Sequence, residues 1–213
     1  MAYALEHYPG FFIALEGIDG SGISTQIARL SQALSAHRKI MTTKQPSNGP
    51  VGSLIRQVLT GRLQGVNSKT LALLFAADRQ DHFAQEVESV LADGGVVLCD
   101  RYLWSTFAYQ GLDLDVSWLR QINGFTVAPD LTVLIKVRPA VSMKRIEEGR
   151  FHAELFEQED LLERIYTNYL TLVAEAKEAG QRVVEVDGEQ SAEDVTVAVL
   201  AAIFQAFPQI ELT

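Results

Sequence analysis

The sequence predicts an α/β fold in which helices cover both faces of a parallel β-sheet. Short apolar runs, each as long as a buried strand, alternate with longer stretches that have the apolar periodicity of helices. A Gly-rich turn joins the first apolar run to the first helical stretch. The 213 residues show no internal repeat or break in composition, and they suffice to bury one full core. We therefore expect one domain that binds its ligands at the carboxyl ends of the strands.

Five short apolar runs are the expected strands. Turn-forming residues mark the entry to three of them: Gly94 and Gly95 for the third, Pro129 for the fourth and Gly180 for the fifth. The runs lie at 11–15, 39–43, 95–99, 131–137 and 182–187.

Amphipathic stretches between these runs are the expected helices. Ser191, followed three residues later by Asp194, is typical of a helix N-cap. The segment 148–158 has weak periodicity, so it is either a mobile lid or a helix–helix connection, and the sequence favours neither. We divide the chain into an extension, 1–10, and a domain, 11–213. The expected helices are 24–36, 50–60, 68–92, 103–111, 115–125, 139–149, 157–179 and 191–207.

Composition narrows the possible functions. A net charge of −9 argues against a broad nucleic-acid-binding face and against a patch for anionic membranes. No segment approaches the roughly 20 apolar residues of a membrane span, and residues 1–10 lack the basic region of a signal peptide. Cys99 is the only cysteine and closes an apolar run, so we expect a buried thiol in a protein of the cytoplasm. The four histidines have no metal-ligand spacing.

The turn after the first strand has the pattern of a phosphate-binding loop without its lysine. In the pattern G-x-x-x-x-G-K-[ST], backbone amides and a helix N-terminus hold phosphates. Gly17, Gly22 and Ser24 are in register with it, but Ile23 occupies the lysine position. The alternative is a Gly-rich strand-to-helix turn without a ligand. Three glycines and a hydroxyl pair with correct flanking periodicity favour a phosphate site, which would comprise Gly17, Asp19, Gly20, Ser21, Gly22, Ile23, Ser24 and Thr25.

Polar residues also follow the third strand. Asp100 and Arg101 end that strand, where a carboxylate beside the loop suits Mg²⁺ and a guanidinium suits an anion. An isolated Asp-Arg pair could equally cap the strand end. A short helical stretch follows, and its spacing puts polar side chains on neighbouring faces, as in the cradle of a small molecule. These side chains are Ser105, Thr106, Tyr109 and Gln110.

Two further segments carry candidate ligand-binding residues. Lys44 and Pro46 lie just after the second strand. Phe75 and Arg79 are one helical turn apart, which suits a base that stacks on the ring and bonds to the guanidinium. Taken alone, this pair could also be a core phenylalanine and a surface arginine.

Together these segments resemble the thymidylate kinases, which are nucleoside monophosphate kinases, over nearly the whole chain after residue 10. The segments that carry the resemblance are Glu16–Gly20, Phe75–Arg79, Asp100–Tyr102, Ser105–Thr106 and Ala108–Gln110. The resemblance implies a P-loop nucleoside triphosphate hydrolase fold with a five-stranded parallel sheet. It also implies transfer of the γ-phosphoryl group of ATP to dTMP, giving dTDP for dTTP biosynthesis, with Mg²⁺.

The resemblance assigns roles to individual residues. Asp19 resembles the aspartate that faces the acceptor's sugar and phosphate, and Arg101 the arginine that grips this phosphate. Phe75 resembles the residue that stacks on thymine, and Arg79 the one that reaches a base oxygen. Lys44 and Pro46 fall in the acceptor site. The residues that resemble the base-recognition edge are Ser105, Thr106 and Gln110. Tyr109 resembles the tyrosine that crowds the sugar 2′ position.

The remaining roles concern the donor and the metal. Ser24 and Asp100 resemble the Mg²⁺ residues, and Thr25 a phosphate contact. Arg150 falls where bacterial-type members keep lid arginines, and we count it with Asp19, Asp100 and Arg101 among the catalytic candidates. The resemblance also implies a homodimer, through helical faces with surplus apolar residues. These residues are Ile55, Val58, Leu59, Leu71, Leu74 and Val87.

Three departures from the family pattern concern the site. Ile23 replaces the loop lysine, Lys44-Gln45-Pro46 replaces Arg-Glu-Pro, and Lys136 stands where an aspartate is common. Lys144, Arg145 and Arg150 are candidates to replace the lost cation. The interpretation is an active dTMP kinase with a weakened or relocated cation. The alternatives are a catalytically impaired nucleotide-binding relative, acting as a sensor or partner, and a kinase for another monophosphate.

Overall fold

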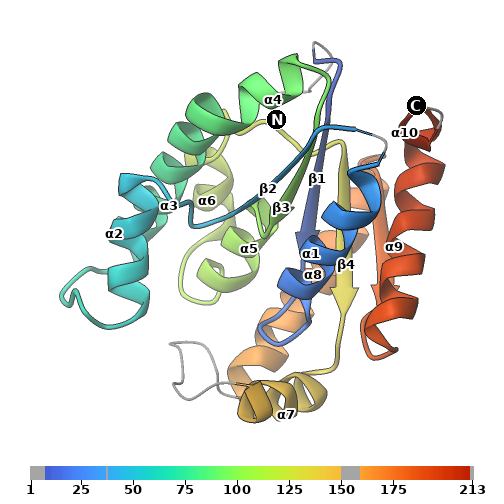
Figure 1. The fold of residues 1–213 in the computed structure, drawn as a ribbon. Helices are drawn as coiled ribbons and strands as arrows, with labels where there is room; N and C mark the ends of the chain where they lie inside the picture. Colours follow the sequence, from blue (N-terminus) through green and yellow to red (C-terminus); the bar gives the residue numbers. More distant parts are fainter. Residues whose placement is uncertain (1–7, 37, 150–158, 212–213) are drawn as a thin grey trace.

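The computed structural model describes residues 8–36, 38–149 and 159–211, and these form a five-stranded sheet between two layers of helices (Figure 1). All four strand pairings are parallel, and the order across the sheet is β2-β3-β1-β4-β5. The five strands are β1 (Phe11–Glu16), β2 (Ile40–Lys44), β3 (Val96–Asp100), β4 (Leu131–Lys136) and β5 (Val183–Asp187). The predicted fold class is therefore confirmed, and each strand lies where an apolar run was noted.

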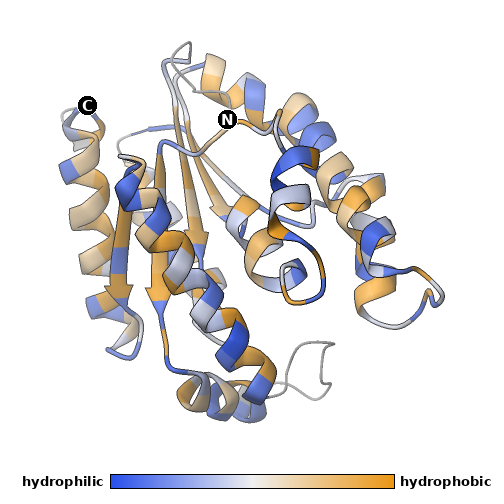
Figure 2. Ribbon diagram, turned by 180° about the vertical axis from the view of Figure 1, so that it is seen from behind, coloured by the Kyte–Doolittle hydropathy of each residue, from blue (hydrophilic) through white to orange (hydrophobic). Residues whose placement is uncertain are grey.

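The central strands are buried on both faces. In β1, Ile13 and Leu15 face one apolar cluster and Phe12 and Ala14 face another, because successive strand residues point to opposite sides. Figure 2 shows the strands as largely hydrophobic ribbons between helices of mixed character. Cys99 of β3 is fully buried, as expected.

Two helices cover one face of the sheet. The apolar sides of α1 (Ile23–Leu34) and α9 (Ala192–Ala206) form one cluster with β1, β3 and β4. The N-cap of α9 is Ser191, whose Oγ accepts a hydrogen bond from the Asp194 N–H at 3.1 Å, as the sequence predicted. A short helix, α10 (Pro208–Glu211), was not predicted. It starts after Phe207, with a proline at its first position.

The other face is covered by α3, α4, α5 and α8. The predicted helix 68–92 is α3 (Ser68–His82), a π-helical segment (Phe83–Val87) and α4 (Glu88–Ala92) in direct succession. Helix α5 (Leu103–Ser105) likewise continues as a π-helical segment (Thr106–Gln110). The other helices are α2 (Pro50–Leu59), α6 (Val116–Ile122), α7 (Pro139–Gly149) and α8 (Glu159–Glu178). No helix among the described residues is long and apolar enough to cross a membrane.

The layers leave the carboxyl ends of the strands open for a site. Helix α7 lies beyond these ends, and α2 lies beside α3 at the β2 side of the molecule (Figure 1). Of the expected extension, residues 8–10 are described, and Tyr8 donates a hydrogen bond to Glu88 at 2.6 Å. The expected lid lies outside the described residues apart from 148 and 149, which end α7, and Arg150 lies outside them as well.

Candidate active site

The turn between β1 and α1 has the backbone of a phosphate-binding loop. Gly20 and Gly22 have φ angles of 74° and 90°, a region that favours glycine. Gly22 is the N-cap of α1, and no described side chain caps the amides that follow it. Amides of this kind at a helix N-terminus, together with the positive end of the helix dipole, are suited to hold an anion.

Ile23 occupies the lysine position of this loop, and its side chain is buried. It is 5% exposed and belongs to the apolar cluster that also contains Ile27, Val137 and Val186. Ile23 therefore contributes a backbone amide to the loop and adds an apolar side chain to the core. It does not supply a charge.

Ser24 and Asp100 bring two oxygen ligands together at the start of α1. Ser24 Oγ donates a hydrogen bond to Asp100 Oδ2 at 2.6 Å. No cluster of three acidic, histidine or cysteine ligands occurs among the described residues. A hydroxyl and one carboxylate are nevertheless enough for Mg²⁺, which usually takes its remaining ligands from phosphates and water. The pair therefore fits the predicted metal role. Thr25, the next residue, is exposed on α1.

Arg101 joins the loop to the helix that follows β3. Its Nη1 donates to the Gly17 carbonyl at 2.6 Å, and its Nη2 donates to Asp19 Oδ1 at 2.8 Å. The guanidinium lies 5.1 Å from the ring centre of Tyr109, whose hydroxyl donates to Asp19 Oδ2 at 3.1 Å. Burial opposes the charge, but the surrounding tyrosines and carboxylates raise the pKa of Arg101 overall. The loop and the predicted phosphate-gripping arginine thus form one unit.

Glu16 accepts hydrogen bonds from several residues beneath this unit. The sequence pattern had assigned no role to it. Its carboxylate accepts from the backbone N–H of Tyr102 at 2.9 Å and from Ser105 Oγ at 2.7 Å. The hydroxyl of Tyr169 on α8 also donates to it, at 3.0 Å. Burial raises the pKa of Glu16, while the hydrogen bond from Ser105 and the charge of Arg101 lower it in part. Nothing in the local sequence around Tyr169 indicated this contact.

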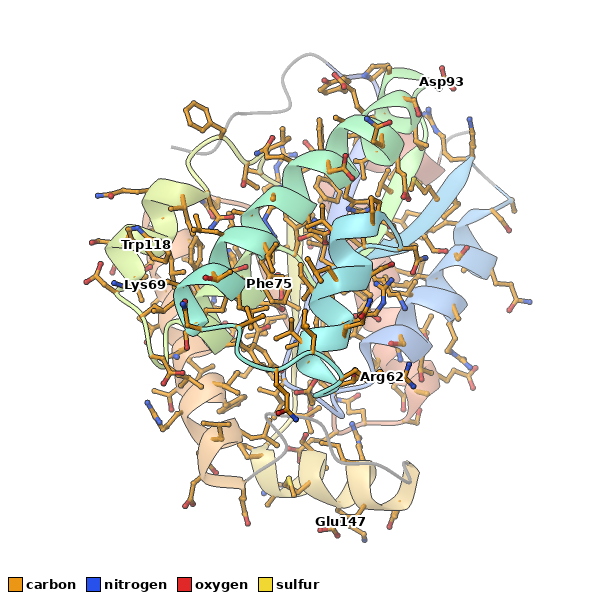
Figure 3. All side chains as sticks on the ribbon, turned by 90° about the vertical axis from the view of Figure 1, so that its left-hand side faces the viewer. Arg62, Lys69, Phe75, Asp93, Trp118 and Glu147 are labelled. Atoms are coloured by element: carbon orange, nitrogen blue, oxygen red, sulfur yellow. The ribbon has the colours of Figure 1, made fainter. Side chains whose placement is uncertain are left out.

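A cavity of about 250 Å³ opens beside these residues at the carboxyl ends of β2 and β3. It brings the predicted acceptor residues together, and two leucines of the expected dimer face, Leu59 and Leu71, line it as well. Figure 3 shows Phe75 toward the middle of α3 and Lys69 at the outer start of that helix. The predicted residues that line the cavity are Asp19, Ser24, Lys44, Pro46, Phe75, Arg79, Asp100, Arg101, Ser105, Thr106, Tyr109 and Gln110.

Arg79 is buried in the wall of this cavity, so the alternative of a surface arginine is wrong. It is 1% exposed, its Nη1 donates to Gln45 Oε1 at 2.6 Å, and its Nη2 donates to Thr106 Oγ1. Burial lowers the pKa of Arg79. Both amide atoms of Gln110 are buried without a hydrogen-bond partner among the described residues. A ligand with both donors and acceptors would satisfy them.

Gln45 is held in turn by His82. Gln45 Nε2 lies 3.4 Å from His82 Nδ1, and Thr43 Oγ1 lies 2.6 Å from His82 Nε2. The 45–46 peptide bond is cis. Where the family pattern has a glutamate, Gln45 gives Arg79 a neutral partner.

The described candidates for a replacement cation are engaged elsewhere. Lys144 is 76% exposed and pairs with Glu148, and Arg145 donates to the Gly188 carbonyl at 2.9 Å. Lys136 pairs with Glu185 at 3.0 Å. Helix α7 reaches the loop through Ser142, whose Oγ donates to the Asp19 carbonyl.

The chain is also similar to known proteins of one family. The family model for thymidylate kinase matches residues 15–199. A probable thymidylate kinase of Pyrobaculum calidifontis is 37% identical over 201 residues, which cover 93% of this chain and 98% of that protein. A thymidylate kinase of Magnetococcus marinus is 36% identical over 199 residues, which cover 89% of this chain and 93% of the other.

Proposed function

Because this chain belongs to the thymidylate kinase family, we propose that it transfers the γ-phosphoryl group of ATP to dTMP and forms dTDP, the precursor of dTTP. The observation that carries the proposal is the direct contact of Arg101 with the phosphate loop, at 2.6 Å to the Gly17 carbonyl. This contact brings an acceptor-gripping cation against a donor-binding loop, as a transfer between two phosphates requires.

The donor side would hold ATP by its phosphates. The free amides of the loop and of the first turn of α1 bind anions without a side-chain charge. Ser24 and Asp100 would hold Mg²⁺ beside them. When bound, this ion neutralises charge on the phosphate oxygens as it develops during transfer.

The acceptor side would hold dTMP in the 250 Å³ cavity. Phe75 offers a ring for the base, and Gln110 offers its edge an amide that has no partner among the described residues. A guanidinium donates hydrogen bonds but accepts none, so Arg79 suits the O4 oxygen of thymine and disfavours the amino group of cytosine. Tyr109 would lie against the sugar.

The transfer itself needs few reacting groups. An oxygen of the dTMP phosphate attacks the γ-phosphorus of ATP. The bond between the γ-phosphorus and the β-γ bridging oxygen breaks, and ADP leaves. Arg101 would hold the attacking phosphate, with Asp19 fixing the guanidinium at 2.8 Å. Positioning of this kind supplies most of the rate in phosphoryl transfer. We also propose a homodimer in the cytoplasm, a setting that the single, buried Cys99 fits.

The test is a coupled assay with ATP, Mg²⁺ and a panel of monophosphates, together with calorimetry. We expect dTMP to be turned over and to bind more tightly than dCMP, dGMP or UMP. Arg79→Met should reduce the preference for dTMP over dCMP about 10–150-fold, since a hydrogen bond to a charged group contributes about 1.5–3 kcal/mol. Equal or tighter binding of a purine monophosphate would refute the proposed acceptor.

A further inference from the structure

We propose that Lys44 supplies the transferred phosphoryl group with the cation that Ile23 cannot provide. The proposal rests on the proposed function and assigns a catalytic residue to it. In phosphate loops of this pattern a lysine contacts the β- and γ-phosphates, and such a charge contributes to the rate of transfer. Here that position belongs to the apolar core.

The strand pairing places Lys44 on the same face of the sheet as Asp100. The two residues end β2 and β3 and are direct partners in the parallel register. Paired residues of neighbouring parallel strands project to the same side. Asp100 projects toward the start of α1, since it accepts the hydrogen bond from Ser24. The Lys44 side chain therefore leaves the sheet toward the metal and phosphate end of the site.

The backbone after Lys44 is fixed against the same strand. The Gln45 N–H donates to the Asp100 carbonyl at 3.1 Å, which continues the β2–β3 pairing past the end of β2. Lys44 and Ser24 line one cavity, together with Asp19 and Arg101. A four-carbon side chain that starts beside Asp100 needs to cross only the space next to that carboxylate to meet a bound phosphate.

Lys44 is also available. It is exposed and forms no ion pair or hydrogen bond with another described residue. Most other lysines are engaged, since Lys39 pairs with Asp93 and Lys177 with Glu185, besides the pairs of Lys136 and Lys144.

The charges around the cavity also favour a further cation beside the phosphates of ATP. Arg101 is paired with Asp19 and assigned to the acceptor phosphate, and the Arg79 guanidinium is held in the wall by Gln45 and Thr106. Asp100 adds a negative charge at the place where ATP brings several more. Lys44 is the cavity-lining cation that carries no described contact.

In a competing interpretation, Lys44 binds only the phosphate of the acceptor. Steady-state kinetics distinguish this role from the proposed one. Lys44→Met should lower kcat about 10²–10³-fold, as for other preorganised donors, and change the KM values by only a few-fold. A role confined to the acceptor would raise the KM for dTMP and leave kcat nearly unchanged, and that result would overturn the proposal. Lys69→Met, an exposed lysine outside the cavity, is the control and should behave as wild type.

Chemical rescue tests whether the charge itself matters. Lys44→Cys can be alkylated selectively, because the only native cysteine, Cys99, is buried. Alkylation with 2-bromoethylamine restores an ammonium at nearly the same place and should recover most of kcat. Alkylation with iodoacetamide adds a neutral group of similar size and should recover none. Equal recovery with both reagents would refute a role for the charge.

A double-mutant cycle tests whether Lys44 replaces the loop lysine. Ile23→Lys alone should raise kcat only slightly, while in Lys44→Met it should recover kcat at least tenfold. If Ile23→Lys changed kcat by the same factor in wild type and in Lys44→Met, the proposal would be contradicted. If Ile23→Lys disrupts the core, the alkylation experiment decides. A wild type inactive on every monophosphate would refute the proposed function as well, whereas an active wild type with an unaffected Lys44→Met would refute this proposal alone.

Discussion

Arg101 adopts a backbone conformation that few residues other than glycine tolerate. Its φ angle of 65° is the only positive value among the described non-glycine residues, and it costs about 1–2 kcal/mol. The contacts of its guanidinium with Gly17, Asp19 and the Tyr109 ring offset this strain. The strained backbone thus aims the side chain at the loop, which marks Arg101 as a residue held for function.

The Ser24 hydroxyl should affect the Mg²⁺ concentration that the reaction requires. Ser24→Ala removes the hydroxyl that meets Asp100 at 2.6 Å. Loss of such a partner typically weakens metal affinity about 10–100-fold. We therefore expect the Mg²⁺ concentration for half-maximal turnover to rise by about that factor, while dTMP binding measured by calorimetry without metal stays unchanged. An unaltered Mg²⁺ dependence would remove Ser24 from the metal site.

His82 should make the stability of the protein depend on pH. Burial lowers its pKa, while Glu86, Asp78 and Asp81 act in the opposite sense and Arg79 adds to the lowering. As the pH falls, the unfolded chain therefore takes up a proton near the ordinary histidine pKa of about 6.5, before the folded chain does. The free energy of unfolding consequently falls as the pH drops below about 6.5.

Urea unfolding at pH 7.5 and 5.5 measures this effect. His82→Asn should lose less stability between the two values than wild type, by at most about 1.4 kcal/mol per pH unit below 6.5. Lys69→Met should follow wild type. If His82→Asn and wild type show the same pH dependence, His82 does not remain neutral in the folded protein.

The phosphate loop is shaped by its packing against α7. A Cβ on Gly20 would lie 2.8 Å from the Ser142 carbonyl oxygen, whereas a Cβ on Gly22 would have no atom of the described residues within 4 Å. Both glycines have positive φ angles, so an alanine at either position is strained. Only Gly20 also makes a close tertiary contact.

This difference gives a matched pair of variants. Gly22→Ala should cost about 1–2 kcal/mol of unfolding free energy from backbone strain. Gly20→Ala should cost about 1–3 kcal/mol more from overpacking, and it should weaken ATP binding through displacement of the loop. Denaturant unfolding and calorimetry with ATP measure both effects. Equal losses in the two variants would show that α7 does not restrain the loop.

The proposed homodimer needs an exposed apolar face on each copy of the chain. Two of the apolar residues expected there, Ile55 and Val87, are buried in the core of this chain, and Leu59 and Leu71 line the cavity. The exposed apolar side chains of the same region are Leu54 on α2 and Leu73 on α3, at 36% and 50% exposed. Val58 and Leu74, the other two expected residues, are half-buried. A dimer through α2 and α3 would therefore include Leu54 and Leu73 besides these two residues.

Light scattering at micromolar concentration tests this face. We expect a dimeric mass for wild type and a monomeric mass for Leu73→Glu, because a buried unpaired charge is costly in an apolar interface. Val197→Glu is the control, since Val197 is 61% exposed on α9, on the opposite side of the molecule (Figure 1). A monomeric wild type would exclude the dimer.

The strands, most helices and the phosphate loop could be predicted from local sequence patterns. Alternating apolar runs and helical periodicity are local patterns, and the ends of parallel strands meet at one edge, so the approximate position of the site followed as well. The membership of most cavity residues was therefore predictable, including that of Phe75 and Thr106.

The contacts of the cavity side chains could not be predicted in this way, because they depend on how distant segments pack. Arg79 is bonded to Gln45, 34 positions away, and Glu16 to Tyr169, 153 positions away. Ile23 lies in the core, while Lys44 lies beside Asp100. These outcomes depend on strand order and on packing between distant segments, which determine whether a polar group meets a partner, a ligand or water. Local periodicity carries no information about such contacts, so the sequence could predict which residues line the cavity but not which partners they contact.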